Sequence, residues 1–220
     1  AWAGQLWSVS GPPLVLRWRA QYLRDVRLFP GGDKFAAWGS DDVVVIGDAW
    51  SASILCELEH AAAVADLLVF PTGDKVLTRC PRAATVWDAG DGQQLSVTTD
   101  ATAVLGIAIF PDGSAYVTLN SRNIIQITCV STGHVQVAVA LVPELRVGFI
   151  QVFPVGRRLL ITSMPLGVVV FDPDPTQRRS LWMHQRFESV FASAISVDGN
   201  QVAMLDNRGV TVWSLSGAGD

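Results

Sequence analysis

Three histidines are the side chains in this sequence best suited to acid–base or metal chemistry: His60, His134 and His184. A zinc site needs His or Cys ligands at a close, defined spacing. The three histidines lie far apart in the sequence, and no Cys or carboxylate accompanies any of them at such a spacing. The sequence therefore predicts no metal site, and we expect a structural role for His60.

Other motifs for catalysis or cofactor binding are absent from the sequence. It contains neither Gly-x-Ser-x-Gly nor a Gly-Lys-Ser/Thr loop for phosphate. The run from Asp88 to Gly92 has the residue types of a calcium loop, but it lacks alternating ligands and a closing Glu. We therefore interpret it as an Asp/Gly turn, and expect no catalytic residue and no cofactor.

The number and spacing of the cysteines indicate whether the protein belongs in an oxidising or a reducing compartment. Cys56, Cys80 and Cys129 form an odd and sparse set, which is a poor disulfide framework. Each lies in a strand-like run, so we expect small buried thiols. With the absence of Asn-x-Ser/Thr sites, this pattern favours an intracellular, cytoplasmic location.

Arginines and tryptophans at predicted loops or outer strands are the candidates for partner binding. Arg-rich loops can hold acidic partners, and exposed tryptophans form strong contacts. The alternative is an ordinary solvated loop surface. The candidates are Arg79, Arg82, Arg122, Arg186, Arg208, Trp50 and Trp182.

Composition narrows the class of protein. Of the 220 residues, 50% are hydrophobic and 16% are charged, enough apolar surface for a folded core. The net charge of −4 argues against nucleic-acid binding and against a basic membrane-binding patch. No uncharged apolar run approaches the roughly 20 residues that span a bilayer.

A short turn sequence recurs along the chain at intervals of 40 to 43 residues. Proline presets φ at the second position of a turn, and glycine adopts the positive φ that other residues resist. Apolar runs flank each copy, so each copy predicts a hairpin turn between two strands. The copies are Phe29–Gly32, Phe70–Gly73, Phe110–Gly113, Phe153–Gly156 and, more weakly, Ser196–Gly199.

A third and a fourth strand follow each hairpin. Trp87 and Trp213 each lie fourteen residues after the turn glycine, and the same offset gives Ile46 and Ile127, with Phe171 one residue later. We predict that these large apolar residues share one position of the third strand. The predicted fourth strands are 53–59, 94–99, 134–141 and 178–184.

Four short antiparallel strands in about forty residues are typical of one β-propeller blade. The sequence therefore predicts an all-β fold, a propeller of about five four-stranded blades. At the start of the chain, Gln5–Ser10 and Leu14–Trp18 are predicted as a third and a fourth strand. The boundaries are a half-blade at 1–24, blades at 25–60, 61–100, 101–142 and 143–185, and a partial blade at 186–220.

The second copy, Phe70 to Asp88, resembles the WD40 repeat, because an apolar strand and its turn are followed by Trp-Asp at the end of the third strand. His60 lies thirteen residues before Gly73, where that family commonly has the His of a Gly-His pair. The third copy also resembles the related YVTN-type repeat, from Ala115 to Asn120. The resemblance covers the whole chain and implies a propeller.

The chain departs from the WD40 pattern in its polar network. The family often ties the His to an Asp between the second and third strands. Asp41 or Asp42 fits that place in the first copy and Asp206 in the fifth, but Pro81-Arg82 occupies it beside His60. Asp100 takes the His position in the third copy. We expect packing between neighbouring sheets to compensate.

Two arrangements of the repeats remain open: a five-bladed ring with a spare N-terminal strand, and a piece of a longer propeller. The leading functional hypothesis is a non-enzymatic scaffold that presents loop faces to protein or peptide partners. One alternative is a small-ligand or enzymatic propeller of the lactonase-like or quinoprotein-like kind. A second is a regulatory sensor segment of a larger multidomain protein.

Overall fold

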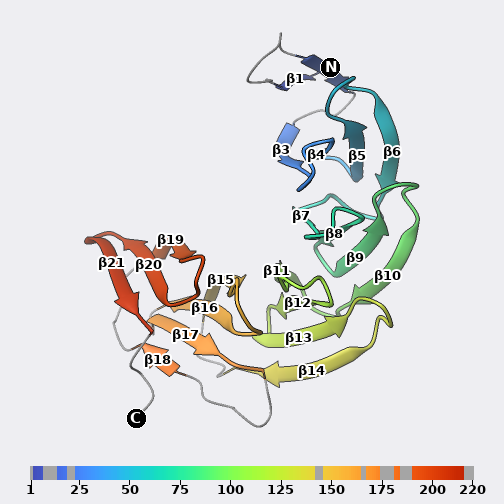
Figure 1. Cartoon of the computed structure of the whole chain (residues 1–220). Coiled ribbons are helices and arrows are strands. Elements are labelled where there is room, and N and C mark those ends of the chain that lie inside the picture. The colour runs from blue at the N-terminus through green and yellow to red at the C-terminus, as the bar shows by residue number, and fades with distance from the viewer. Residues whose placement is uncertain are drawn as a thin grey trace. The chain divides into compact units, whose positions relative to one another are not determined.

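The computed structural model describes residues 2–6, 14–18, 23–141, 146–164, 167–173, 181–183 and 190–215. These residues form twenty-one β-strands and no helix (Figure 1). Every strand pairs antiparallel with a strand next to it in the sequence. The all-β class predicted from the sequence is confirmed.

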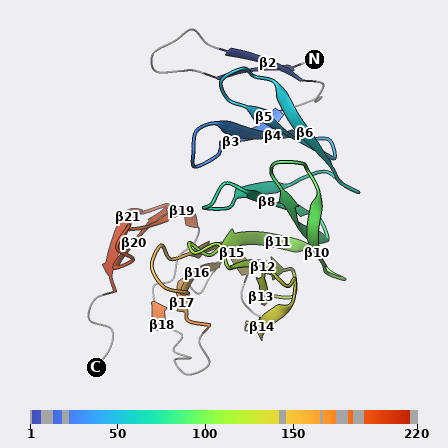
Figure 2. The same cartoon turned by 45° about the vertical axis from the view of Figure 1, so that its right-hand side comes forward.

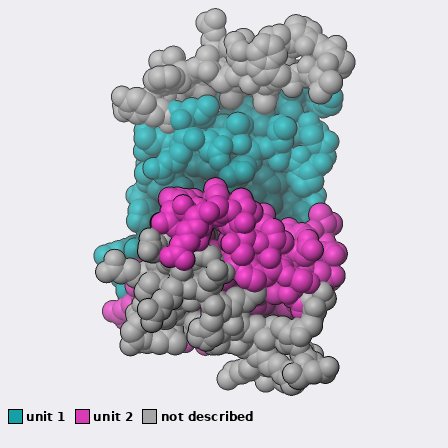
Figure 3. All heavy atoms as spheres, turned by 90° about the vertical axis from the view of Figure 1, so that its left-hand side faces the viewer, with its two compact units in different colours: residues 1–105 teal, residues 106–220 magenta. Residues whose placement is uncertain are grey.

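Contacts between residues divide the chain into two compact units, 1–105 and 106–220 (Figure 3). Unit 1 contains the two-stranded sheet β1-β2 and the four-stranded sheets β3-β4-β5-β6 and β7-β8-β9-β10. Their bounds are β1 Trp2–Leu6, β2 Leu14–Trp18, β3 Leu23–Leu28, β4 Lys34–Gly39, β5 Val43–Asp48, β6 Ile54–Glu59, β7 Asp66–Val69, β8 Lys75–Cys80, β9 Ala83–Asp88 and β10 Gln94–Thr99.

Unit 2 contains the four-stranded sheet β15-β16-β17-β18, the three-stranded sheet β19-β20-β21, and all of the sheet β11-β12-β13-β14 except the first two residues of β11. The bounds are β11 Val104–Ile109, β12 Ala115–Asn120, β13 Ile124–Cys129, β14 Val135–Ala140, β15 Arg146–Val152, β16 Leu159–Met164, β17 Gly167–Phe171, β18 Leu181–Met183, β19 Val190–Ile195, β20 Gln201–Asp206 and β21 Gly209–Ser214.

The recurring turn has the predicted hairpin geometry. In the second copy the Gly73 N–H donates to the Phe70 carbonyl at 2.9 Å, and Gly73 has a φ of 71°. The corresponding glycines of the other four copies have φ between 67° and 76°. A side chain disfavours this left-handed conformation, so glycine is the suitable residue at each turn.

The predicted fourth strands agree closely with the observed strands. β2 and β10 have the predicted bounds, while β6 and β14 lie inside the predicted ranges 53–59 and 134–141. β18 is a short central part of the predicted strand 178–184. At the start of the chain, β1 is Trp2–Leu6 rather than the predicted 5–10, and Trp7 lies outside the described residues.

The predicted equivalence along the third strands is wrong for two of the five copies. Trp87, Phe171 and Trp213 each lie opposite the first or second residue of the preceding strand, at Val76, Leu159 and Val202. In the first and third copies the second residue of the preceding strand is Phe35 and Tyr116. The residues that lie opposite these two are Gly47 and Thr128, and not the predicted Ile46 and Ile127. The turns 40–42 and 121–123 are one residue longer than the turn 81–82, which moves the register by one.

Each of these five cross-strand pairs includes one aromatic ring, although the strand that supplies it differs. The ring comes from the third strand in Val76–Trp87 and from the second strand in Phe35–Gly47. A Cβ on Gly47 would lie 2.2 Å from Cζ of Phe35, so the Phe35 ring already fills that space. An aromatic ring therefore occupies the same cross-strand pair in each sheet, but it comes from the second strand in some sheets and from the third strand in others.

The core of unit 1 is formed jointly by its two four-stranded sheets. Phe35 and Ile46 of one sheet belong to the same buried cluster as Leu67, Val76 and Trp87 of the other. The strands of both sheets are visible from two directions in Figures 1 and 2. β6 and β10 each form one edge of their sheet, and β3 and β7 form the opposite edges. No helix in the described part of the chain is long and apolar enough to cross a membrane.

Candidate functional site

Unit 1 contains a cavity of about 400 Å³ among the described residues. Its lining comes from the end of β6 and the link after it, the end of β8 and the turn that follows, the strand β9, and the edge strand β10. It is bounded by Glu59, His60, Ala61, Ala62, Cys80, Pro81, Arg82, Ala83, Thr85, Trp87, Gln94, Val97 and Thr99.

A chain of hydrogen bonds lies along one wall of the cavity. Trp87 Nε1 donates to Thr78 Oγ1 at 2.9 Å, and His60 Nε2 lies 2.9 Å from the same hydroxyl oxygen. His60 Nδ1 lies 3.0 Å from the carbonyl oxygens of Asp42 and Leu58. The His60 and Trp87 rings are tilted against each other, with centroids 4.8 Å apart.

These partners fix the tautomer of His60. Both neighbours of Nδ1 are carbonyl oxygens, so Nδ1 carries the proton and donates, and Nε2 accepts the hydroxyl proton of Thr78. Burial lowers the pKa of His60, opposed by the hydrogen bonds to the backbone of Asp42 and Leu58. Neutral His60 is therefore a structural link between the Asp42 carbonyl and the Thr78 hydroxyl.

Cys80 forms part of the cavity wall. It is 8% exposed and its thiol donates to the carbonyl of Ala62 at 3.3 Å. Burial raises the pKa of Cys80 and, with the nearby charge of Asp91, that of Cys56. In unit 2, hydrogen bonds from Ser131 and Thr132 lower the pKa of Cys129 to about 7. Cys80 therefore contributes apolar surface rather than a thiolate nucleophile.

The turn that carries Arg82 is held at both of its residues. The Pro81 carbonyl accepts from the Val104 N–H and the Arg82 carbonyl from the Asp100 N–H, each at 2.9 Å. The Arg82 side chain is exposed and forms neither an ion pair nor a hydrogen bond with the described residues. A fixed backbone thus presents an unpaired cation at the rim of the cavity.

Arg79, which the sequence grouped with Arg82, has a different place. It lies in β8, half-buried, and its guanidinium donates to the carbonyl of Val104 at 3.0 Å. Burial is the largest influence on the pKa of Arg79 and lowers it. Arg79 ties the start of β11 to β8, and it is not among the residues that line the cavity.

The remaining candidates do not join this site. Trp50 lies in the turn between β5 and β6 and is 71% exposed, and its N–H donates to Asp48. Arg122 and Arg208 are exposed in two turns of unit 2. Arg186 lies outside the described residues, as does the side chain of Trp182, whose backbone is part of β18.

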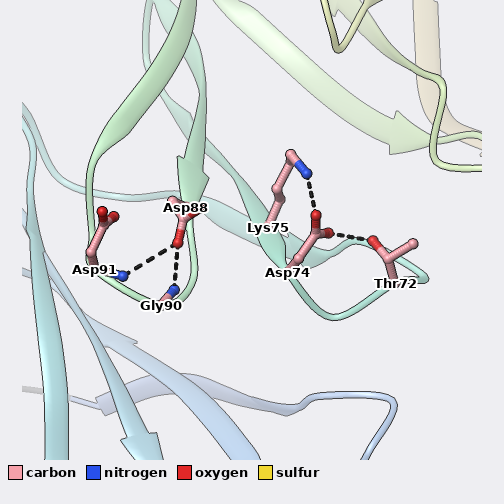
Figure 4. Close-up of polar contacts among 6 residues, drawn as sticks. All are labelled: Thr72, Asp74, Lys75, Asp88, Gly90 and Asp91. Atoms are coloured by element: carbon pink, nitrogen blue, oxygen red, sulfur yellow. Dashed lines mark hydrogen bonds and ion pairs between the residues drawn. The ribbon is translucent and has the colours of Figure 1, made fainter.

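The Asp-rich run that resembled a calcium loop is a self-contained turn. Asp88 Oδ1 accepts from the Gly90 N–H at 2.7 Å and from the Asp91 N–H at 3.3 Å (Figure 4). In the neighbouring turn, Asp74 bonds to Thr72 and Lys75. These carboxylates bind their own turns, as predicted for the first of them. Among the described residues no group of three or more His, Cys, Asp or Glu side chains could hold a metal ion.

Arg82 was predicted from the sequence as a binding residue, but most of the apolar wall of the cavity was not. Val97 and Thr99 lie on β10, where pairing with β9 shifts between Gln94 and Ser96. Gln94 and Val97 both line the cavity, although three residues apart. No simple alternation in the sequence signals such a shift.

No protein-family model matches this chain, and a search of curated proteins found no relative.

Proposed function

We propose that the chain is part of a WD40-like β-propeller and acts as a non-enzymatic module that binds protein or peptide partners. The observation that carries this proposal is the open cavity of about 400 Å³ beside β10. The repeated four-stranded meanders and their shared turn support the propeller assignment. Rigid repeats with variable connecting segments suit the docking of partners.

The state of the polar side chains in the cavity supports binding rather than catalysis. Both ring nitrogens of His60 are engaged by the protein itself. The raised pKa of Cys80 keeps its thiol protonated. Catalytic acids, bases and nucleophiles need access to substrate and a suitable pKa, and neither residue meets both needs.

The dimensions of the cavity suit a side chain of a partner. Ligand sites are typically about 300–1,000 Å³ and mostly apolar, with a few polar groups that fix orientation. Here Trp87, Val97 and Ala61 offer apolar surface, and Glu59 and Arg82 lie exposed at the rim. A large apolar side chain of a peptide can enter this space with room to spare.

A displayed library of random twelve-residue peptides, selected on the full 220-residue chain, tests this function. Recovered peptides are titrated against the chain by fluorescence anisotropy. Ala61 is exposed and lines the cavity, so Ala61→Tyr takes up part of the cavity without replacing a core residue. We expect saturable binding that Ala61→Tyr weakens by at least about tenfold, which corresponds to the loss of one buried apolar group.

Ala63 provides the matched control, because it is exposed in the same link but does not line the cavity. Ala63→Tyr should leave the affinity of the recovered peptides unchanged. The proposal fails if no peptide binds saturably, or if the two tyrosine variants bind the recovered peptides equally well.

A further inference from the structure

The cavity rim has one positively charged residue, Arg82, and one negatively charged residue, Glu59. Arg82 comes from the turn between β8 and β9, and Glu59 is the last residue of β6. Both side chains are exposed, and neither has an ion-pair or hydrogen-bond partner among the described residues. The turn that carries Arg82 is held by two backbone hydrogen bonds, from the Asp100 N–H to the Arg82 carbonyl and from the Val104 N–H to the Pro81 carbonyl. The guanidinium of Arg82 is therefore available at a fixed point of the rim.

The edge strand β10 contributes three lining residues, Gln94, Val97 and Thr99. An edge strand leaves backbone N–H and C=O groups unpaired along its outer side. An extended peptide is the partner that can use such an edge, and its alternate side chains then enter neighbouring pockets. The lining therefore favours an extended segment over a folded surface.

We propose that the cavity binds an extended peptide in which a large apolar residue is next to a single acidic residue. The apolar side chain packs against Trp87, Val97 and Cys80, and the adjacent carboxylate pairs with Arg82. Glu59 disfavours a second acidic residue on the other flank, because like charges repel across the rim. This inference rests on the proposed peptide-binding function and adds the chemistry of the ligand.

Arginine suits this role because its planar guanidinium can hold both oxygens of a carboxylate. The pair forms at an exposed rim, so its contribution is modest and its main effect is to select among peptides. The apolar residue should therefore determine affinity, and the acidic residue should determine which peptides are preferred.

Selection of the same random peptide library on two charge-reversal variants tests this ligand chemistry. On the unmodified chain we expect enrichment of Phe, Trp or Leu next to one Asp or Glu. On Arg82→Glu the acidic residue should give way to Lys or Arg. Anisotropy titration of one recovered acidic peptide should show about tenfold weaker binding to Arg82→Glu, and replacement of its apolar residue by Ala should weaken binding about thirtyfold.

Arg27 supplies the control, because it is an exposed arginine of unit 1 outside the cavity lining, paired with Asp25 at the surface. Arg27→Glu should leave the selected motif unchanged. If recovered peptides lose binding in Ala61→Tyr but show no acidic preference, or the same motif on Arg82→Glu, the ligand chemistry is wrong while the binding function stands. If no peptide binds, or Ala61→Tyr has no effect, both proposals fail.

Discussion

The two four-stranded sheets of unit 1 have the same strand order, yet they place the aromatic ring of the equivalent pair on different strands, and only the ring of sheet β7–β10 is joined to a chain of side-chain hydrogen bonds. In sheet β7–β10, Trp87 of the third strand supplies the aromatic ring opposite Val76. In sheet β3–β6, Phe35 of the second strand supplies it opposite Gly47. Phe35 is fully buried, whereas Trp87 retains 7% exposure beside the cavity.

The type of aromatic residue decides whether the pair contains a polar group that needs a hydrogen-bond partner. The indole N–H of Trp87 needs an acceptor, which Thr78 provides, and Thr78 in turn bonds to His60. In the other sheet the residue that corresponds to Thr78 is Ala37, which is 1% exposed. A phenyl ring makes no such demand, so Phe35 itself needs no hydrogen-bonding partner. The same sheet nevertheless contains a buried indole N–H, on Trp38, that has no hydrogen-bond partner among the described residues.

The largest expected effect comes from giving both sheets a ring on the third strand. In Gly47→Trp the new side chain meets the Phe35 ring, which is fully buried and cannot move into solvent. We expect the free energy of unfolding to fall by about 3 kcal/mol. Denaturation by urea, followed by circular dichroism, measures this loss.

The double variant Phe35→Val with Gly47→Trp copies the Val76–Trp87 pair and serves as the rescue. It should recover about 2 kcal/mol of the loss, because the two residues compete for one space. If the losses of the two single variants simply add, the two pairs are not alternative ways of filling one position.

A smaller effect is expected from Thr78→Val, which keeps the shape of the side chain and removes its hydroxyl. The Trp87 N–H loses its acceptor and His60 Nε2 loses its donor. We expect a loss of about 2 kcal/mol in the free energy of unfolding, measured by the same denaturation. Thr118→Val, at the matching position of β12, should cost clearly less, and equal costs would show that the hydroxyl chain contributes nothing.

The smallest effect is a dependence of stability on pH through His60. Its pKa in the folded chain lies below the ordinary value of 6.5, so the unfolded chain binds the proton first as pH falls. Stability is full above pH 6.5 and declines as pH drops from 6.5 toward the folded-state pKa. The unfolding free energy of the unmodified chain should therefore fall relative to that of His60→Gln between about pH 7.5 and pH 5. Parallel curves for the two proteins would contradict this assignment.

The local features of this protein could be predicted from the sequence because they depend on nearby residues. The hairpin turns follow from Pro and Gly at fixed places, and Gly73 has the positive φ that this pattern requires. The bounds of β10 and the self-contained turn at Asp88 were predicted for the same reason. The exposure of Trp50 follows from its place in a turn.

The tertiary structure decided the cross-strand register and the composition of the candidate site. A turn one residue longer puts Gly47 and Thr128, rather than Ile46 and Ile127, in the place that Trp87 has in its sheet. Arg82 faces a cavity, while Arg79 in the preceding strand is tied to Val104. The first outcome depends on the length of the turn between two consecutive strands, and the second on a contact between residues 25 apart in the sequence. The side-chain pattern along one strand does not specify its register with the next strand. The sequence by itself therefore determined the repeated meander and its turns, and tertiary packing determined which residues form the site.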